Sequence, residues 1–227
     1  MIKNIVPSAF RDRYRSAYLK ANLGLKVIWG KLTRMVHRPT LPKCENGSVK
    51  LHLGCGSVSH PGYVNIDLYP HPHIHYVHSI DRLPMFRDNT VDLIYACHCL
   101  EHFPHGTVPA VLSEWHRVLK RDGVLRLSVP DFDLLLEMYA RTGKEVGKNM
   151  EVMNMALMGG QDSPLNFHRS VFNMESLARL LTQVGFRVTR RWTPEALGSD
   201  SFDDWSQKAL SVEGMKYPFS LNVEAIK

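Results

Sequence analysis

The sequence predicts an α/β fold built on a mostly parallel seven-stranded sheet with an antiparallel last strand. Three observations lead to this class. From residue 49 onward, apolar runs of strand length alternate with helical patterns. The runs 91–97 and 123–129 are mostly apolar, as strands covered on both faces are. The run 218–226 instead alternates apolar and polar residues, a period of two that favours an antiparallel strand.

The individual elements follow in chain order. Apolar residues at helical spacing predict a helix over 8–37, which Gly24 is expected to break into two pieces, and a proline-containing linker follows at 39–47. The expected strands are 49–53, 63–67, 74–80, 91–97, 123–129, 185–192 and 218–226. The expected helices of the body are 107–120, 131–141, 145–158 and 173–184. We therefore divide the chain into an arm with its linker, 1–47, and one domain, 48–227.

Charge separates the arm from the body. Residues 1–43 hold ten Lys or Arg and one acid, Asp12, so they carry +9 and leave −3 for the rest of a chain whose net charge is +6. The helix at 8–37 either packs on the domain with its charges in water, or meets anionic lipid as a peripheral membrane contact or an acidic partner. The acidic body argues against nucleic acid as a partner. No feature indicates the oligomeric state.

Cysteine usage and hydropathy bear on the compartment. The four cysteines lack zinc-ribbon spacing, and we interpret them as free thiols in a reducing compartment. Residues 1–10 contain no apolar run of signal-peptide length, and no apolar stretch approaches the ~18 residues of a membrane span. We expect a cytoplasmic protein, peripheral to the membrane if the arm binds lipid.

The stretch VKLHLGCGSVSHPGYVNID, 49–67, is the most informative part of the chain. It predicts a buried strand, a glycine turn and a second strand that ends in a carboxylate. Gly54-Cys55-Gly56 allows the backbone to turn sharply and approach a ligand closely. Asp67 is placed to accept hydrogen bonds from two ribose hydroxyls. This layout indicates a nucleoside-cofactor site.

Further motifs follow in a fixed order. They are LHLGCG at 51–56, VNID at 64–67, LPMFRDNTVDLIYACHCLEHF at 83–103, WHRVLKRDGVLRLSVPD at 115–131, HRSVFNMESLARLLTQVGF at 168–186 and SLNVEAIK at 220–227. With them, Val49 to Lys227 resembles the class I S-adenosylmethionine-dependent methyltransferases. It looks most like the small methyltransferase-11-type enzymes that are often associated with glycan and cell-surface polymer pathways. The resemblance implies a Rossmann-like three-layer sandwich, S-adenosyl-L-methionine as cofactor and a small-molecule or glycan acceptor.

The resemblance also implies roles for particular residues. The glycine turn would hold the methionine part of the cofactor, Ile80 and Asp81 would flank adenine, and Ala96 to His98 would line the methyl-transfer point. The expected cofactor-binding residues are Leu53, Gly54, Cys55, Gly56, Asp67, Leu68, Ile80, Asp81, Cys97 and His98. Asp92, which begins a strand, is interpreted as a cap or salt-bridge residue remote from the cofactor.

Three departures from the family pattern stand out. His52 occupies a position that usually holds an acid, and Val58 replaces the third glycine. The ten residues between Gly56 and Asp67 are too few for a crossover helix and a strand. We therefore expect the first crossover helix to be missing or reduced to one turn, which opens the pocket unless the arm covers it.

Four residues are candidates for general base, because an oxygen nucleophile often needs one and histidine suits neutral pH. They are His98, Glu101, His102 and His168, of which we predict the three histidines as catalytic. Each could instead be a hydrogen-bonded structural residue.

Other histidines and the tryptophans receive simpler interpretations. Surface or strand roles are expected for His71, His73, His75 and His78, and no metal is expected. Trp115 is expected in the core, whereas Trp192 and Trp205 are candidate acceptor contacts.

The leading hypothesis is an S-adenosylmethionine-dependent O-methyltransferase of a saccharide or glycan intermediate. One alternative is methylation of another small metabolite. A second is a catalytically silent cofactor-binding partner protein, which His52 and the shortened loop motivate. Cofactor binding without turnover on any acceptor would favour the silent protein.

Overall fold

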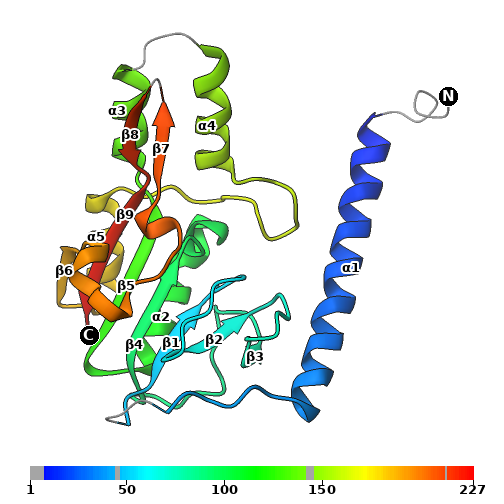
Figure 1. Ribbon diagram of the computed structural model, residues 1–227, viewed down its shortest axis with the longest axis vertical. Coiled ribbons are helices and arrows are strands. Elements are labelled where there is room, and N and C mark those ends of the chain that lie inside the picture. Colours follow the sequence, from blue (N-terminus) through cyan, green and yellow to red (C-terminus); the bar gives the residue numbers. More distant parts are fainter. Residues whose placement is uncertain (1–7, 44–46, 142–145, 213) are drawn as a thin grey trace.

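A computed structural model describes residues 8–43, 47–141, 146–212 and 214–227, and its main sheet confirms the predicted class (Figure 1). Within this part of the chain seven strands pair in the order β3-β2-β1-β4-β5-β9-β6, and only β9 runs antiparallel to its neighbours β5 and β6. The strands are β1 Lys50–Leu53, β2 Val64–Asp67, β3 Tyr76–Val77, β4 Val91–Cys97, β5 Leu119–Pro130, β6 Val188–Arg191 and β9 Ser220–Ile226.

The helices lie close to their predicted ranges. They are α1 Ser8–Val36, α2 Val108–Val118, α3 Phe132–Arg141, α4 Val146–Met158 and α5 Met174–Gln183, with short 3-10 turns η1 Leu100–His102, η2 His105–Thr107, η3 Pro194–Asp200 and η4 Trp205–Gln207. Two predicted strands have half their expected length or less. Strand β3 has two residues of the predicted 74–80, because the His75 ring accepts the Asn65 N–H at 2.8 Å where a backbone carbonyl would otherwise pair. Strand β6 covers 188–191 of the predicted 185–192.

One face of the sheet is apolar and is covered by α2 and α5. Alternate strand residues such as Leu51, Ile94 and Val223 are fully buried there with helix residues. Trp115 of α2 is fully buried in this layer, as predicted, and its indole N–H donates to the Ile80 carbonyl at 2.7 Å. This hydrogen bond ties the helix layer to the loop after β3.

The opposite face has aromatic rings where the first crossover helix would pack. Residues 54–63 contain turns but no helix, which confirms that this helix is missing. Tyr95 and Phe202 stack with ring centroids 4.0 Å apart, and the His52 ring lies 4.6 Å from Phe202. The Tyr95 hydroxyl donates to Asp204 at 2.8 Å. The segment of η3 and η4 thus covers this face in place of the helix.

Beyond the carboxyl end of β5, helices α3 and α4 and a hairpin form a smaller unit at the top of Figure 1. The hairpin pairs β7 Ala209–Val212 with β8 Met215–Pro218 and was not predicted, because each strand is too short to display a clear period of two. Leu135, Met153 and Tyr217 belong to the shared apolar core.

Helix α1 corrects the expected break at Gly24, because it runs without interruption from Ser8 to Val36. A single exposed glycine costs a helix only about 1 kcal/mol relative to alanine. The C-terminal part of the helix lies against the loop around β3 (Figure 1). Arg34 donates from Nε to the Ile74 carbonyl and from Nη2 to the His71 carbonyl, both at 2.7 Å. At Gly30 a Cβ would lie 2.5 Å from Pro70, so glycine permits this close approach.

Candidate active site

Two adjoining cavities open at the carboxyl ends of β1, β2 and β4. The larger, of about 750 Å³, is lined by Asp67, Leu68 and Ile80, among others. The smaller, of about 490 Å³, is lined by Cys97, His168 and residues of the α3–α4 unit and the η4 turn. Seven residues line both cavities: Gly54, Gly56 and Ser57 of the glycine turn, His98 and His102, and Asp162 and Asn166. A ligand group at this shared boundary would contact both chambers.

The glycine turn has the conformation that its sequence predicted. Gly54 and Gly56 have φ of 63° and 53°, in the left-handed region where other residues are strained. A Cβ at Gly54 would lie 2.7 Å from Cys99 Cβ, whereas at Gly56 nothing lies within 4 Å. The backbone at Gly56 is therefore open to the cavities that it lines.

Asp67 ties the turn to the end of β2. Its carboxylate accepts the Gly56 N–H at 2.8 Å and the Tyr69 N–H at 2.7 Å, and the residue is 8% exposed on the wall of the larger cavity. A carboxylate has about four lone-pair positions, so two remain for hydroxyl donors. The position fits a ribose diol.

The remaining predicted cofactor residues divide into two groups. Leu68 and Ile80 line the larger cavity, Cys55 and Cys97 line the smaller, and His98 lines both. Leu53 is fully buried in the core and Asp81 lies on neither cavity wall.

His52, at the position of the usual acid, is an uncharged residue. It is 2% exposed among aromatic rings, and burial, with His73 and His60 adding to it, lowers the pKa of its imidazole to about 3. A neutral ring therefore stands beside the glycine turn where a negative charge is usual.

We expect His52 to make folding pH-dependent. The unfolded chain takes up the proton first as the pH falls, so stability that is complete above the unfolded pKa of 6.5 is lost progressively toward pH 3. Between pH 6.5 and 5, the loss is about 2 kcal/mol. The free energy of unfolding of His52→Phe, measured in denaturant at several pH values, should lack this part of its slope against pH.

The exposed His105 provides the matched control, because His105→Phe should keep the slope of the unmodified protein. Equal slopes for His52→Phe and the unmodified protein would contradict the assignment of a buried neutral ring.

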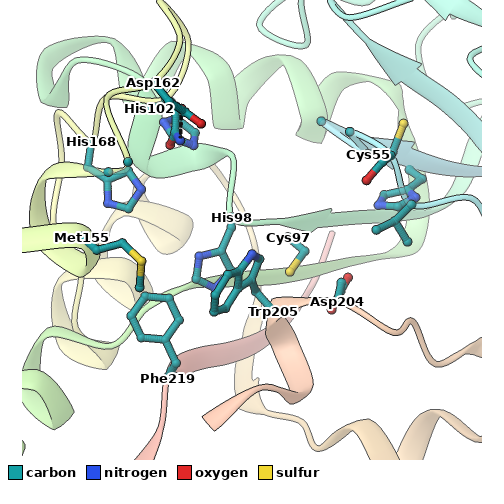
Figure 2. A pocket seen from close by; sticks show the side chains of 18 residues that line it. Cys55, Cys97, His98, His102, Met155, Asp162, His168, Asp204, Trp205 and Phe219 are labelled. Atoms are coloured by element: carbon teal, nitrogen blue, oxygen red, sulfur yellow. Dashed lines mark hydrogen bonds between the residues drawn. The ribbon is translucent and has the colours of Figure 1, made fainter. Parts of the chain in front are cut away.

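His98 lies at the boundary of the two cavities and has a strained backbone. Its φ of 50° is rare for a residue other than glycine, and such strain costs about 1–3 kcal/mol. Its Nε2 lies 2.7 Å from the Ser220 hydroxyl, and its Nδ1 lies 3.2 Å from Oε1 of Glu101. Figure 2 shows the His98 ring between Trp205 and the rings of His102 and His168.

Glu101 lies at the centre of the predicted catalytic residues. It is fully buried, and neither carboxylate oxygen accepts a hydrogen bond of acceptable geometry from the described residues. His168 Nε2 lies 3.9 Å from its Oε1, and the His102 and His168 rings have centroids 4.9 Å apart. Burial would raise the pKa of Glu101, but His98, His102 and His168 hold it below its usual value. The fold thus brings all four base candidates together.

The smaller cavity includes residues that the sequence analysis did not single out. They are Met155, Gly159, Gly160, Asp162, Asn166, Asp204 and Phe219, beside the predicted acceptor contact Trp205. The turn residues of GGQDSPLN, 159–166, which precede His168, were the available signal. Trp192 is 8% exposed in the aromatic layer and lines neither cavity.

Several structural interpretations are also settled. Asp92 accepts from Lys120 Nζ and the Val49 N–H at 2.8 Å, remote from both cavities, as predicted. His75 accepts from Asn65, and His73 Nε2 lies 3.1 Å from the Gly56 carbonyl, so these histidines have structural partners. Cys55, Cys97 and Cys99 are free thiols, and Cys44 lies outside the described residues.

Comparison with known proteins settles the family. A family model described as a methyltransferase domain matches residues 37–191, more than half of the chain. The chain belongs to this methyltransferase family. It is a class I S-adenosylmethionine-dependent methyltransferase. No curated protein matches the sequence. The boundary between arm and domain at residues 47 and 48 stays a prediction.

Solved methyltransferases resemble this one at low sequence identity. A SAM-dependent methyltransferase from Archaeoglobus fulgidus is 15% identical with a TM-score of 0.48, and the match covers 96% of this chain and 98% of that one. The 1,6-didemethyltoxoflavin-N1-methyltransferase from Burkholderia thailandensis is 16% identical with a TM-score of 0.48, and the match covers 100% of this chain and 92% of that one. A SAM-dependent methyltransferase from Methanosarcina mazei is 16% identical with a TM-score of 0.49, and the match covers 82% of this chain and 94% of that one.

S-adenosylmethionine is the cofactor of this methyltransferase, and the larger cavity fits it. The open backbone at Gly56 and the two free acceptor positions of Asp67 suit a methionine moiety and a ribose, respectively. No helix in the part of the chain that the structure describes is long and apolar enough to cross a membrane. In addition, no described residue of α1 lines either cavity.

Proposed function

We propose that this methyltransferase O-methylates a polyhydroxylated acceptor of the saccharide class, bound in the smaller cavity. The observation that carries the proposal is the lining of that cavity. Trp205 and Phe219 supply flat apolar surfaces, while Asp162, Asn166 and Asp204 supply hydrogen-bonding groups. A sugar has both an apolar ring face and hydroxyl groups, so such a lining is suited to it.

The residues at the shared boundary support oxygen as the accepting atom. When bound, the cofactor supplies an electrophilic methyl group on its sulfonium. Ser220 donates its hydroxyl proton to the Trp205 carbonyl at 2.8 Å, so its oxygen is free to accept the His98 Nε2 proton. His98 Nδ1 is then available to take the proton of an acceptor hydroxyl, and Glu101, 3.2 Å away, would stabilise the resulting imidazolium. Alignment of acceptor and methyl group would supply the rest of the acceleration.

The experiment has two stages. Calorimetric titration with S-adenosylmethionine and S-adenosylhomocysteine tests the larger cavity. Isotope-labelled methyl transfer to a panel of mono- and oligosaccharides, with amine and carboxylate acceptors beside them, tests the smaller one. We expect cofactor binding and an acid-stable methyl ether on a sugar hydroxyl.

Each other outcome overturns the proposal in a distinct way. Methylation confined to an amine or a carboxylate would assign the enzyme to other small metabolites. Tight cofactor binding with no turnover on any acceptor would favour the catalytically silent partner protein, which the neutral His52 motivates. Failure to bind cofactor would reject the larger cavity as its site.

We also propose that α1 holds the enzyme at an anionic membrane surface. The side of the helix opposite Gly30 and Arg34 carries large apolar side chains that are all more than half exposed. At 3.6 residues per turn they lie within about 120° of arc. They are Tyr18, Leu25, Ile28, Trp29, Leu32, Met35 and Val36. An interfacial helix has such a stripe, with aromatic residues at the headgroup level.

Charge favours lipid over a second copy of α1. Exposed Lys26 borders the apolar stripe on one side, and Lys20 and Lys31 border it on the other. Residues 1–43 contain a single acid, so two copies of α1 would bring like charges together, whereas anionic headgroups would neutralise them. Each cation near such a surface contributes about 1 kcal/mol.

Vesicle co-sedimentation of the full chain tests this contact. Because three lysines contribute about 3 kcal/mol, binding to phosphatidylglycerol vesicles should be roughly 100-fold tighter than to phosphatidylcholine vesicles. The double variant Leu25→Glu with Leu32→Glu should abolish it, whereas Thr40→Glu with Ser211→Glu, the same charge change at exposed sites off α1, should reduce it little. A dimer that the first variant disrupts, without vesicle binding, would contradict the proposal.

A further inference from the structure

Three histidine rings around Glu101 direct their protonated nitrogens away from it. The His168 Nδ1 lies 2.8 Å from the Ala156 carbonyl, and the His102 Nδ1 lies 3.2 Å from the Phe167 carbonyl. A carbonyl only accepts, so each Nδ1 carries the proton in these hydrogen bonds. In His98 it is Nε2 that carries the proton. Ser220 donates its own hydroxyl proton to the Trp205 carbonyl, so its oxygen accepts the hydrogen bond from the His98 ring.

The other nitrogen of each ring, if the ring is neutral, presents a lone pair to the site. His98 Nδ1 and His168 Nε2 lie 3.2 and 3.9 Å from Glu101 Oε1. Lone pairs on nitrogen and oxygen repel one another at these distances. A fully buried carboxylate is costly as well unless a positive charge is paired with it. A cation among these atoms would remove both costs.

We infer that Glu101, His102 and His168 bind a divalent transition-metal ion of the zinc class at the boundary of the two cavities. The ligand atoms of these three side chains all lie within 4.8 Å of one another. Two imidazoles and one carboxylate form a donor set that suits zinc and leaves a coordination position open.

The surroundings of the site match those of metal-binding histidines. Such histidines usually donate their second ring N–H to a carbonyl or carboxylate, which fixes the ring and its tautomer. His102 and His168 both do so, to carbonyls of residues 167 and 156. The Glu101 carbonyl in turn accepts the Arg169 and Ser170 N–H groups at 2.8 and 3.1 Å. The loop that carries His168 is thus fastened to the turn that carries Glu101 and His102.

The open coordination position would face the acceptor chamber, since His102 and His168 line the smaller cavity. An ion there would bind an acceptor oxygen and lower the pKa of its hydroxyl, while His98 takes the proton. This role rests on the proposed O-methylation, whereas binding of the ion does not. Metal binding measured directly therefore separates a failure of this inference from a failure of the proposed function.

The test uses the untagged full chain, stripped of metal and titrated with Zn²⁺ by calorimetry and with Co²⁺ by visible absorption. We expect one ion per chain and a Co²⁺ spectrum with nitrogen ligands. Glu101→Gln and His168→Ala should each weaken binding by roughly 100-fold or more. His105→Ala, at an exposed histidine three residues beyond the 102 position, should leave binding unchanged.

Two results would overturn the inference. One is a folded, stripped protein that binds neither ion, with NMR identifying an imidazolium at His98, His102 or His168, because a proton would then play the part of the cation. The other is binding that survives both cluster variants and is lost on His71→Ala with His73→Ala, because the ion would then bind at that stacked pair. Thermal melts check that each variant is folded before it is titrated.

Discussion

Asp67→Ala is expected to weaken S-adenosylmethionine binding by roughly 10²–10⁴-fold. A hydrogen bond to a charged group contributes about 1.5–3 kcal/mol, so two ribose hydroxyls on this carboxylate account for about 3–6 kcal/mol. The substitution also removes the acceptor of the Gly56 and Tyr69 N–H groups, which shape the turn. Calorimetric titration with S-adenosylmethionine and S-adenosylhomocysteine measures the effect.

Asp203→Ala, at an exposed position, serves as the control for Asp67→Ala. It removes an acid of the same type that lies on neither cavity wall, and it should leave cofactor affinity within about twofold. Asp67→Asn should be intermediate, because the amide keeps one acceptor oxygen without the charge. Unchanged affinity in folded Asp67→Ala protein would refute the placement of the ribose.

Substitutions at the two glycines of the turn should have different effects. Gly54→Ala combines left-handed strain with a contact of 2.7 Å to Cys99 Cβ, so we expect unfolding to become easier by about 2–5 kcal/mol. Gly56→Ala adds a methyl group with nothing within 4 Å, so it should cost only the strain of about 1–2 kcal/mol. Its methyl group would occupy cofactor space and weaken binding instead.

The comparison needs two measurements on each variant, the free energy of unfolding in denaturant and the affinity for S-adenosylhomocysteine. Gly106→Ala, at an open position away from the turn, controls for the loss of glycine itself. Equal destabilisation by Gly54→Ala and Gly56→Ala would contradict the close contact with Cys99.

Local spacing explains why so much of the cofactor side could be predicted. A glycine turn between two strands and ten residues to Asp67 determine both the approach of the backbone and the absence of a crossover helix. Those features depend on residues close together in the sequence. The antiparallel strand β9 could be predicted as well, because its alternation of apolar and polar residues extends over its full length.

The acceptor side was harder to predict, because distant segments build it. His98 and His102 share one turn with Glu101, but His168 reaches them only because its loop hydrogen-bonds to the Glu101 carbonyl. The sequence identified Glu101 and each histidine as candidates without indicating that the carboxylate is fully buried among the rings. The break expected at Gly24 was wrong for a related reason: a local propensity of about 1 kcal/mol is small beside the contacts that hold the helix.

Strand order has a consequence for synthesis of the chain. Strand β6 pairs with β9 and with no other described strand, and it precedes β9 in the sequence. During translation the backbone groups of β6, and one edge of β5, therefore wait without their native partner until residues 220–226 have left the ribosome. The nascent sheet is exposed to wrong pairing during this interval. A stalled or truncated product that lacks these residues would be a substrate for chaperones or proteases.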